Sequence, residues 1–315
     1  SSPTPERTVV LWQSPTDDGG SSATREAAAL TSAAVRQGCQ VLTFLRSRRA
    51  VEYVASLVRE QHAEDASTPP GSDAIAAYRG GFLAEERRAL EDGLRSGSIR
   101  ALATTNALEL GIDIAGMDVV VTAGWPGTRS SLWQQFGRAG RGTSAALAAF
   151  VAREDPLDTY LVQHPEALTA QPFEETIFDP SNPNVLAPHL LAAAHELPIA
   201  NDEHVFPENS GEVLDELGAR GLLRVRPPGG YWTSRERPHD MTDLRGAGDT
   251  VRIVEEDTGR LLGTVDSASA HRHVHPGAVY VHQGVSHTVQ SLDVHDAVAI
   301  ARTEAVSYTH LRAHE

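Results

Sequence analysis

The first half of the chain alternates short apolar runs with amphipathic stretches. Apolar runs typical of buried strands lie at 9–13, 40–45, 74–79, 99–105, 119–122 and 145–151. Stretches with apolar residues at helical spacing lie at 23–36, 50–59, 83–95, 133–138 and 155–164. Alternating strands and helices are joined by right-handed crossovers. The pattern therefore predicts an α/β fold whose mostly parallel sheet is covered by helices on both faces.

The pattern changes after residue 164. Prolines become frequent at 165–182, which indicates a domain boundary. The elements predicted next are helices at 183–197 and 211–220, a strand at 222–225, a turn at 227–230 and a return strand at 231–233. This order is typical of a winged helix. Such a domain often binds DNA, and it offers Arg220, Arg224 and Arg226 as candidate contacts.

The last part of the chain, residues 244–300, is β-rich. Apolar and polar residues alternate there between glycine turns, which predicts a small barrel or sandwich. The predicted domains are residues 1–168, 169–240 and 241–304. Residues 305–315 fit none of these patterns and are left out of the fold prediction.

Three histidines in the β-rich part, His271, His273 and His275, alternate along the sequence. On a strand, this spacing would align three imidazoles on one face, where they could hold a transition metal. Exposed strand histidines are common, however, and no carboxylate stands at a suitable spacing. We therefore expect no metal site.

Composition narrows the class of protein. A single cysteine, Cys39, excludes a disulfide framework and a cysteine-based zinc site within these 315 residues. No apolar run is long enough to span a membrane, so we expect a soluble, cytoplasmic protein. The formal net charge of −15 argues against a generally basic nucleic-acid-binding surface, although a locally basic groove stays compatible with it.

The sequence contains no lysine. Its lysine and arginine total of 27 consists entirely of arginine. A P-loop needs a lysine to contact the β- and γ-phosphates of a nucleotide. This chain therefore carries no P-loop of its own.

Two arginines, Arg138 and Arg141, stand three residues apart and are flanked by Gly137, Gly140 and Gly142. On a helical turn, that spacing would place both guanidinium groups on one face. Two permanently charged groups suit the charge that develops on a phosphoryl group in transfer. The alternative is a solvated surface helix.

The segment 132–142, LWQQFGRAGRG, and the upstream segment 103–113, ATTNALELGID, resemble motifs VI and V of the superfamily 2 helicases of the DEAD/DEAH-box type. The resemblance implies a RecA-like domain that works with ATP and Mg²⁺. It implies that Arg138 and Arg141 act as arginine fingers. The residues that it assigns to the nucleotide are Gly111, Asp113, Gln134, Arg138 and Arg141.

Two further segments follow the family's order. The turn RSRR at 46–49 resembles motif IV, and YRGGF at 78–82 resembles the next motif. The residues that the resemblance assigns to the nucleic-acid backbone are Arg46, Ser47, Arg79, Gly80, Thr105 and Asn106. For each of these turns, the alternative is a plain strand-to-helix connection.

The segment 178–199, FDPSNPNVLAPHLLAAAHELPI, narrows the resemblance to the Hrq/MrfA-type DNA helicases. That branch implies DNA repair, 3′-to-5′ movement on single-stranded or tailed DNA, and a nucleoid-associated location. The chain then corresponds to the C-terminal half of a motor, and its partner is the N-terminal RecA-like domain of the same polypeptide. Alone it is expected not to hydrolyse ATP. The cysteine-rich zinc module of that branch has no counterpart in these residues.

Two other functions remain open at this point. A RecA-like remnant with a winged helix could serve as a non-catalytic nucleic-acid-binding module. An RNA helicase of the same superfamily is the other alternative, because contacts to a nucleic-acid backbone are largely blind to sequence.

Overall fold

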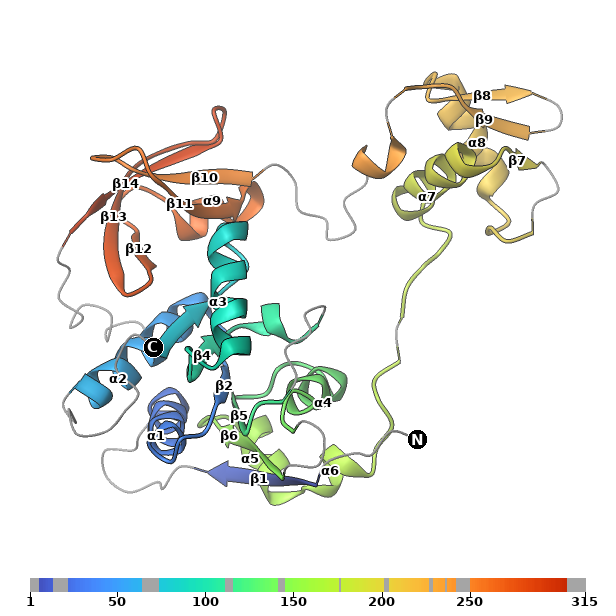
Figure 1. Cartoon of the computed structure of the whole chain (residues 1–315). Helices are drawn as coiled ribbons and strands as arrows, with labels where there is room; N and C mark the ends of the chain where they lie inside the picture. Colours follow the sequence, from blue (N-terminus) through green and yellow to red (C-terminus); the bar gives the residue numbers. More distant parts are fainter. Residues whose placement is uncertain are drawn as a thin grey trace. The chain divides into compact units, whose positions relative to one another are not determined.

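The computed structural model describes residues 6–13, 22–63, 74–110, 116–140, 145–175, 177–200, 204–226, 229–235, 237–241 and 250–304. The chain divides into two compact units (Figure 1). The first comprises Ser1–Glu174 together with Asp249–Glu315, and the second comprises Glu175–Gly248. None of the helices in the described ranges is long and apolar enough to cross a lipid bilayer.

A six-stranded parallel sheet forms the centre of the first unit, with the strand order β1-β6-β5-β2-β4-β3. Its strands are β1 (Arg7–Gln13), β2 (Val41–Phe44), β3 (Ile75–Tyr78), β4 (Ala101–Thr104), β5 (Val119–Ala123) and β6 (Ala146–Ala152). Because parallel strands all end at the same edge, the loops that follow β5, β2, β4 and β3 form one row along the carboxyl edge. The predicted parallel α/β sheet is confirmed.

Helices cover both faces of this sheet. They are α1 (Ala23–Arg36), α2 (Arg48–Ala63), α3 (Ala84–Ser96), α4 (Arg129–Phe136), α5 (Pro156–Gln163) and α6 (Glu166–Thr169). On one face, α1 and α2 bury Val35 and Val54 against strand residues such as Val121. On the other face, α3 and α4 contribute to a separate core that includes Leu132 and Phe150. The alternating sides of each buried strand thus supply two cores.

The β-rich part of the chain packs within the first unit as a second, curled sheet (Figure 1). Its strands are β10 (Thr250–Glu255), β11 (Leu261–Asp266), β12 (Val279–His282), β13 (Val285–Asp293) and β14 (Val298–Thr303). The order is β11-β10-β14-β13-β12; β10 and β14 are parallel and the other neighbours are antiparallel. This arrangement agrees with the predicted barrel-like region.

The prediction that the three histidines share a strand face is wrong. Residues Ser267–His273 form helix α9, and His275 lies beyond its end. Ala270 and Val274, four residues apart, are both fully buried in the core of the curled sheet. This helical spacing of small and apolar residues overrides the alternation of the histidines. In the described ranges, no group of three or more His, Cys, Asp or Glu side chains could hold a metal ion.

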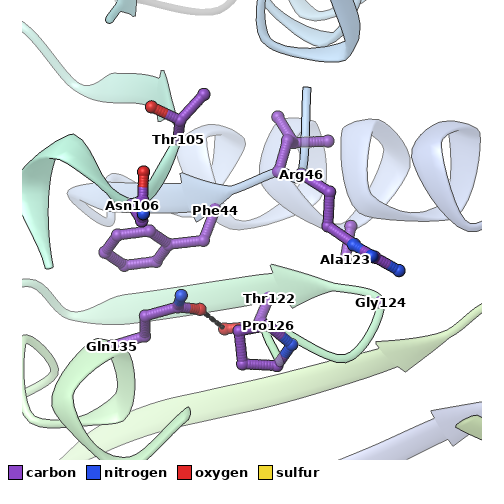
Figure 2. A pocket seen from close by; sticks show the side chains of 10 residues that line it. Phe44, Arg46, Thr105, Asn106, Thr122, Ala123, Gly124, Pro126 and Gln135 are labelled. Carbon is purple, nitrogen blue, oxygen red and sulfur yellow. Dashed lines mark hydrogen bonds between the residues drawn. The ribbon is translucent and has the colours of Figure 1, made fainter. Parts of the chain in front are cut away.

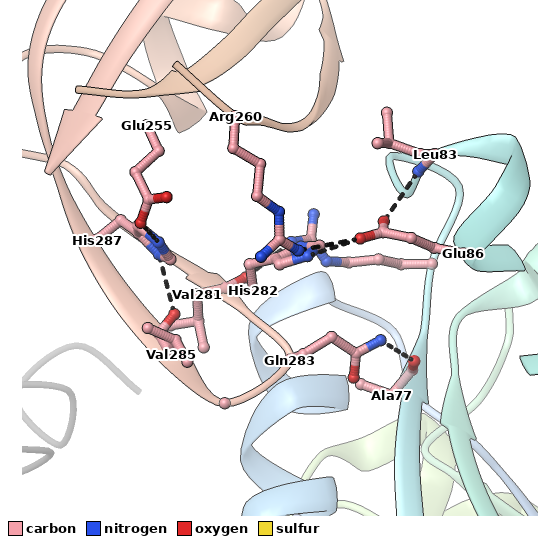
Figure 3. A network of polar contacts seen from close by, with 12 residues as sticks. Ala77, Leu83, Glu86, Glu255, Arg260, Val281, His282, Gln283, Val285 and His287 are labelled. Carbon is pink, nitrogen blue, oxygen red and sulfur yellow. Dashed lines mark hydrogen bonds and ion pairs between the residues drawn. The ribbon is translucent and has the colours of Figure 1, made fainter. Parts of the chain in front are cut away.

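Polar contacts join the curled sheet to the parallel sheet (Figure 3). Glu86, in the first turn of α3, lies 3.1 Å from the ring Nε2 of His282 and 3.5 Å from the guanidinium of Arg260. Gln283 donates a hydrogen bond of 3.3 Å to the carbonyl of Ala77 in β3. The two sheets are therefore held together by side chains as well as by packing.

The second unit is a winged helix, as predicted. Its elements are α7 (Pro183–Glu196), β7 (Ile199–Ala200), α8 (Ser210–Ala219), β8 (Leu223–Arg226), β9 (Gly229–Trp232) and the 3₁₀ turn η3 (Pro238–Met241). The strands form an antiparallel sheet in the order β7-β9-β8, and Leu190, Leu214 and Leu217 lie in its core. The two-residue strand β7 was not predicted, because so short a strand leaves no periodic pattern.

Candidate functional site

The adjacent carboxyl ends of β5, β2 and β4 enclose a cavity of about 140 Å³ (Figure 2). Its lining includes three of the residues that the sequence assigned to nucleic acid, namely Arg46, Thr105 and Asn106. Figure 2 shows Thr105 and Asn106 on one side of the cavity and Arg46 on the other. The sheet order thus brings together residues that lie 59 to 60 positions apart in the sequence.

Thr105 follows the end of β4 and caps the short 3₁₀ helix η2 (Asn106–Leu108). Its hydroxyl oxygen accepts a hydrogen bond of 3.4 Å from the backbone N–H of Ala107. A hydroxyl that accepts one hydrogen bond keeps its own proton for donation. The exposed amide of Asn106 lies next to it. This turn therefore offers donors suited to an oxyanion such as a phosphate.

Arg46 and Ser47 form the turn between β2 and α2, and both are exposed. The hydroxyl of Ser47 accepts a hydrogen bond of 3.1 Å from the backbone N–H of Ala50, in the first turn of α2. Ser47 thereby caps the helix, and this capping turn holds the adjacent Arg46 at the mouth of the cavity.

Arg79 does not lie at this surface. Its side chain is only 2% exposed and lies 3.3 Å from the carboxylate of Glu52. It donates a hydrogen bond of 2.7 Å to the carbonyl of Val281 in β12. Its guanidinium also lies 4.7 Å from the ring centres of both Phe82 and Tyr280. A guanidinium enclosed in this way does not reach a nucleic-acid backbone, so Arg79 is withdrawn from the candidate contacts.

Burial raises the pKa of Glu52, and the positive charge of Arg79 opposes that rise. The pair is therefore held in a poorly solvated environment between the two sheets of the first unit. No sequence pattern indicates this role, because two of the groups that enclose Arg79, Val281 and Tyr280, come from residues about 200 positions later. Gly80, the other candidate in this loop, is exposed.

Arg138 lies beyond the end of α4, so the prediction that it stands on a helical turn with Arg141 is wrong. The helix ends at Phe136. The chain then turns, and Gly140 adopts a φ of +91°, outside the right-handed helical region. Ala139 instead forms a parallel β-bridge with Met117. The backbone and not helical spacing therefore sets the position of Arg138.

The side chain of Arg138 donates a hydrogen bond of 2.7 Å to the backbone carbonyl of Glu109. Glu109 belongs to the motif segment 103–113 and Arg138 to the motif segment 132–142, so this bond connects the two segments. Three of the other residues assigned to the nucleotide by sequence, Gly111, Asp113 and Arg141, lie outside the described residues.

A polar network connects the same two segments. Gln135 is 3% exposed; it accepts a hydrogen bond of 3.0 Å from Thr122 and donates one of 3.0 Å to the carboxylate of Glu109. Ser131 donates to the same carboxylate at 2.5 Å. Sequence reasoning selected the neighbouring Gln134, whose amide donates instead to Ser130 within α4. It missed Gln135 and Glu109; the only sequence signal for them was their position inside the two motifs.

We expect Glu109→Ala to destabilise the fold by about 1–3 kcal/mol, since it removes the acceptor of the Ser131 hydroxyl and leaves the amide of Gln135 with only its 3.4 Å hydrogen bond to Ser131. The Arg138 bond survives, because it uses the backbone carbonyl of residue 109. Urea unfolding followed by tryptophan fluorescence measures the change. The matched control is Glu85→Ala at an exposed position of α3, where a change below about 0.5 kcal/mol is expected. Equal effects of the two variants would exclude a stabilising role for this network.

Two family models match the chain. One, described as "Helicase conserved C-terminal domain", covers residues 25–143, and the other, "ATP-dependent helicase HRQ1, winged helix domain", covers residues 178–247. The first match spans the cavity and both motif segments. The winged-helix match, residues 178–247, nearly coincides with the second compact unit, Glu175–Gly248.

Curated relatives and solved structures match over nearly the whole chain. The uncharacterised ATP-dependent helicase YprA of Bacillus subtilis is 36% identical over 291 residues, which cover 91% of this chain and 38% of that protein. The ATP-dependent helicase hrq1 of Schizosaccharomyces pombe is 31% identical over 99% of this chain and 30% of its own length. The crystal structure of the DUF1998 helicase MrfA bound to DNA matches with a TM-score of 0.82 at 35% identity, over 95% of this chain and 43% of that one. This chain thus spans less than half the length of each of these proteins.

Proposed function

Since this chain belongs to the superfamily 2 helicases of the Hrq/MrfA type, we propose that it supplies the second RecA-like domain, the winged helix and a C-terminal sheet to an ATP-dependent DNA helicase. The remaining parts of the motor, including the P-loop, would belong to an N-terminal RecA-like domain of the same polypeptide. The chain itself has no lysine with which to build a P-loop.

The cavity at the carboxyl edge carries this proposal. It presents the hydroxyl of Thr105, the amide of Asn106 and the guanidinium of Arg46 toward one space. Hydroxyl, amide and guanidinium donors are the groups with which proteins contact phosphate oxygens of nucleic acids. These donors would contact the nucleic-acid backbone and not the bases. Contacts of this kind are independent of sequence, which suits an enzyme that moves along a strand.

The nucleotide would be held by the motif segment 103–113 on the side away from the cavity that Thr105 and Asn106 line. Bound ATP with Mg²⁺ would supply the phosphoryl group whose hydrolysis drives movement. Arg138 would face its γ-phosphate, together with Arg141, while Gly111, Asp113 and Gln134 would line the rest of the nucleotide site. The permanent charge of Arg138, its side-chain bond to Glu109 and its backbone contact with Met117 fit this assignment.

Glu109 would link the two sites. Its backbone carbonyl accepts from Arg138, and its carboxylate accepts from Ser131 and Gln135 of α4. It lies four residues after Thr105. A shift of the nucleotide-facing arginine would therefore be transmitted to the turn that grips the strand, which is the coupling that a translocating motor needs.

The finer assignments rest on the same family relation. We place the helicase in DNA repair, with 3′-to-5′ movement on single-stranded or tailed DNA, and in the cytoplasm with the nucleoid. One of the matching structures is that of MrfA bound to DNA, which favours DNA over RNA for this chain.

We expect Arg46→Glu to weaken binding of this chain to a fluorescein-labelled 20-mer of dT by about tenfold, and Thr105→Ala by about threefold. Fluorescence anisotropy at several salt concentrations measures both changes. Arg95→Glu, at an exposed position of α3, alters the net charge as Arg46→Glu does and serves as the control.

If Arg46→Glu has the same affinity for the dT 20-mer as the Arg95→Glu control, the proposed strand site is wrong. A 20-mer of rU, measured in the same way, tests whether the chain prefers RNA or DNA. Tighter binding of rU than of dT would move the assignment to an RNA helicase.

A further inference from the structure

The curled sheet is fixed against the carboxyl edge of the parallel sheet, at the loop that follows β3. The backbone N–H of Thr264 in β11 donates a hydrogen bond of 3.0 Å to the carbonyl of Gly81. Added to Gly263, a Cβ would lie 2.5 Å from that carbonyl oxygen; added to Gly81, it would lie 2.8 Å from the carbonyl oxygen of Thr264. Both positions therefore need glycine, and the close contact of two backbones holds β11 at this loop.

Helix α9 follows β11 directly and presents a basic outer surface. Ala270 and Val274 face the core of the curled sheet and are fully buried. The three residues between them, His271, Arg272 and His273, are exposed. On an α-helix, the two residues that follow Ala270 turn away from its face, so His271 and Arg272 point away from that core, and His273 lies exposed at the end of the helix.

This basic surface lies near the arginine-rich turn at the mouth of the cavity. Desolvation by the neighbouring residues lowers the pKa of the exposed His273, and the positive charges of Arg48 and Arg272 lower it further, against the effect of Asp266. The guanidinium of Arg48 also lies 3.7 Å from the position of a Cβ on Gly81. Arg48 thus stands between the loop that holds β11 and the turn that carries Arg46.

The arginines of this surface make no direct ion pair with a carboxylate in the part of the chain that the structure describes. Over that part of the chain, Arg46, Arg48, Arg49 and Arg272 form no ion pair. Arg260 and Arg302 of the same curled sheet do form ion pairs, with Glu86 and Glu256. In a chain with a net charge of −15, positive charges from two distant segments that both act on His273 make a local site that favours an anion.

We propose that His271, Arg272 and His273 of α9, together with Arg48, bind the phosphodiester backbone of a nucleic-acid single strand that leaves the cavity at Arg46. This inference rests on the proposed strand site. The row of loops along the carboxyl edge would direct the strand past β4 and β3 to α9. The C-terminal sheet would then be a nucleic-acid-binding part of the motor in addition to a packing element.

The test compares two charge reversals on the curled sheet, Arg272→Glu and Arg252→Glu. Arg252 is an exposed residue of β10 between the buried Val251 and Ile253, so it faces away from the core side on which α9 packs. Both variants change the net charge equally, which cancels long-range effects. Anisotropy with the dT 20-mer is measured for each across a range of salt concentrations.

We expect Arg272→Glu to weaken binding about tenfold and to reduce the slope of log K against log salt by about 0.7 for each lost phosphate contact. Arg252→Glu stays within about twofold of the unaltered protein, and Arg272→Lys keeps most of the affinity, since the charge remains. Similar affinities for the two glutamate variants would overturn the inference and leave α9 as a solvated helix end.

The Arg46→Glu variant separates this failure from that of the proposed function. If Arg46→Glu weakens binding and Arg272→Glu does not, only the role of α9 is lost. If neither variant weakens binding, the strand site itself is wrong, and the inference falls with it.

Discussion

Arg138→Ala, made in the full-length helicase, is expected to reduce DNA-stimulated ATP turnover by about 10³-fold or more. An arginine that stabilises a phosphoryl group in transfer acts mainly in the transition state, so its loss lowers kcat far more than it changes KM. Arg138 suits this role because its side chain bonds the carbonyl of Glu109 and its backbone lies against Met117. The residue is thus held in place before the nucleotide binds.

The measurement is steady-state ATP hydrolysis with and without single-stranded DNA, combined with anisotropy on the same proteins. DNA affinity is expected to change by less than about twofold, because the strand contacts lie at Arg46 and Thr105. Arg138→Lys keeps the charge and loses the forked geometry, so it is expected to recover only part of the activity. Arg95→Ala, at an exposed ion pair, is the control. Retained ATP turnover in Arg138→Ala would remove the finger role.

Arg79→Met is expected to destabilise the first unit by about 3–5 kcal/mol at neutral pH. The change leaves the carboxylate of Glu52, which is 2% exposed, without its charged partner. It also removes the donor to Val281 and the contacts with the rings of Phe82 and Tyr280. Urea unfolding followed by tryptophan fluorescence measures the loss.

Two further variants identify the cause. In Glu52→Gln/Arg79→Met, the amide oxygen still accepts from the backbone N–H of Gly284, and neither of the two replaced residues carries a charge. We expect this double variant to regain at least half of the lost stability. Arg95→Met is expected to change stability by less than about 0.5 kcal/mol, because its ion pair is exposed. A double variant as unstable as Arg79→Met would show that packing and not the unpaired charge explains the loss.

The destabilisation by Arg79→Met should also depend on pH. Burial raises the pKa of Glu52, and the variant removes the charge that opposes this rise. A carboxyl whose folded pKa is raised contributes stability below its unfolded pKa, and this contribution is lost as the pH rises through the folded pKa. The difference from the unaltered protein is therefore expected to be smaller at pH 5 than at pH 8. The reverse order would mean that Glu52 is not the group responsible.

The sequence by itself determined the local elements and the position of the cavity. Buried strands carry uninterrupted apolar runs, and helices carry apolar residues three or four apart, so β2, α1 and α7 could be placed within a few residues. The parallel arrangement followed from the strand–helix alternation. It placed the residues after β2 and β4 at one edge, and the structure brings Arg46 and Thr105 together there.

Only the tertiary structure decided the roles of residues whose partners lie far away in the sequence. Arg79 stands in a motif-like loop, yet Val281 and Tyr280 of a sheet about 200 positions later help to enclose it, and it is a buried ion-pair partner of Glu52. The spacing of His271 and His273 suggested a strand, whereas the burial of Ala270 and Val274 made the segment a helix. Arg138 lies outside helix α4 because the next residue, Ala139, forms a β-bridge with Met117. Periodicity records which side of an element is buried, but it does not record which distant element buries it.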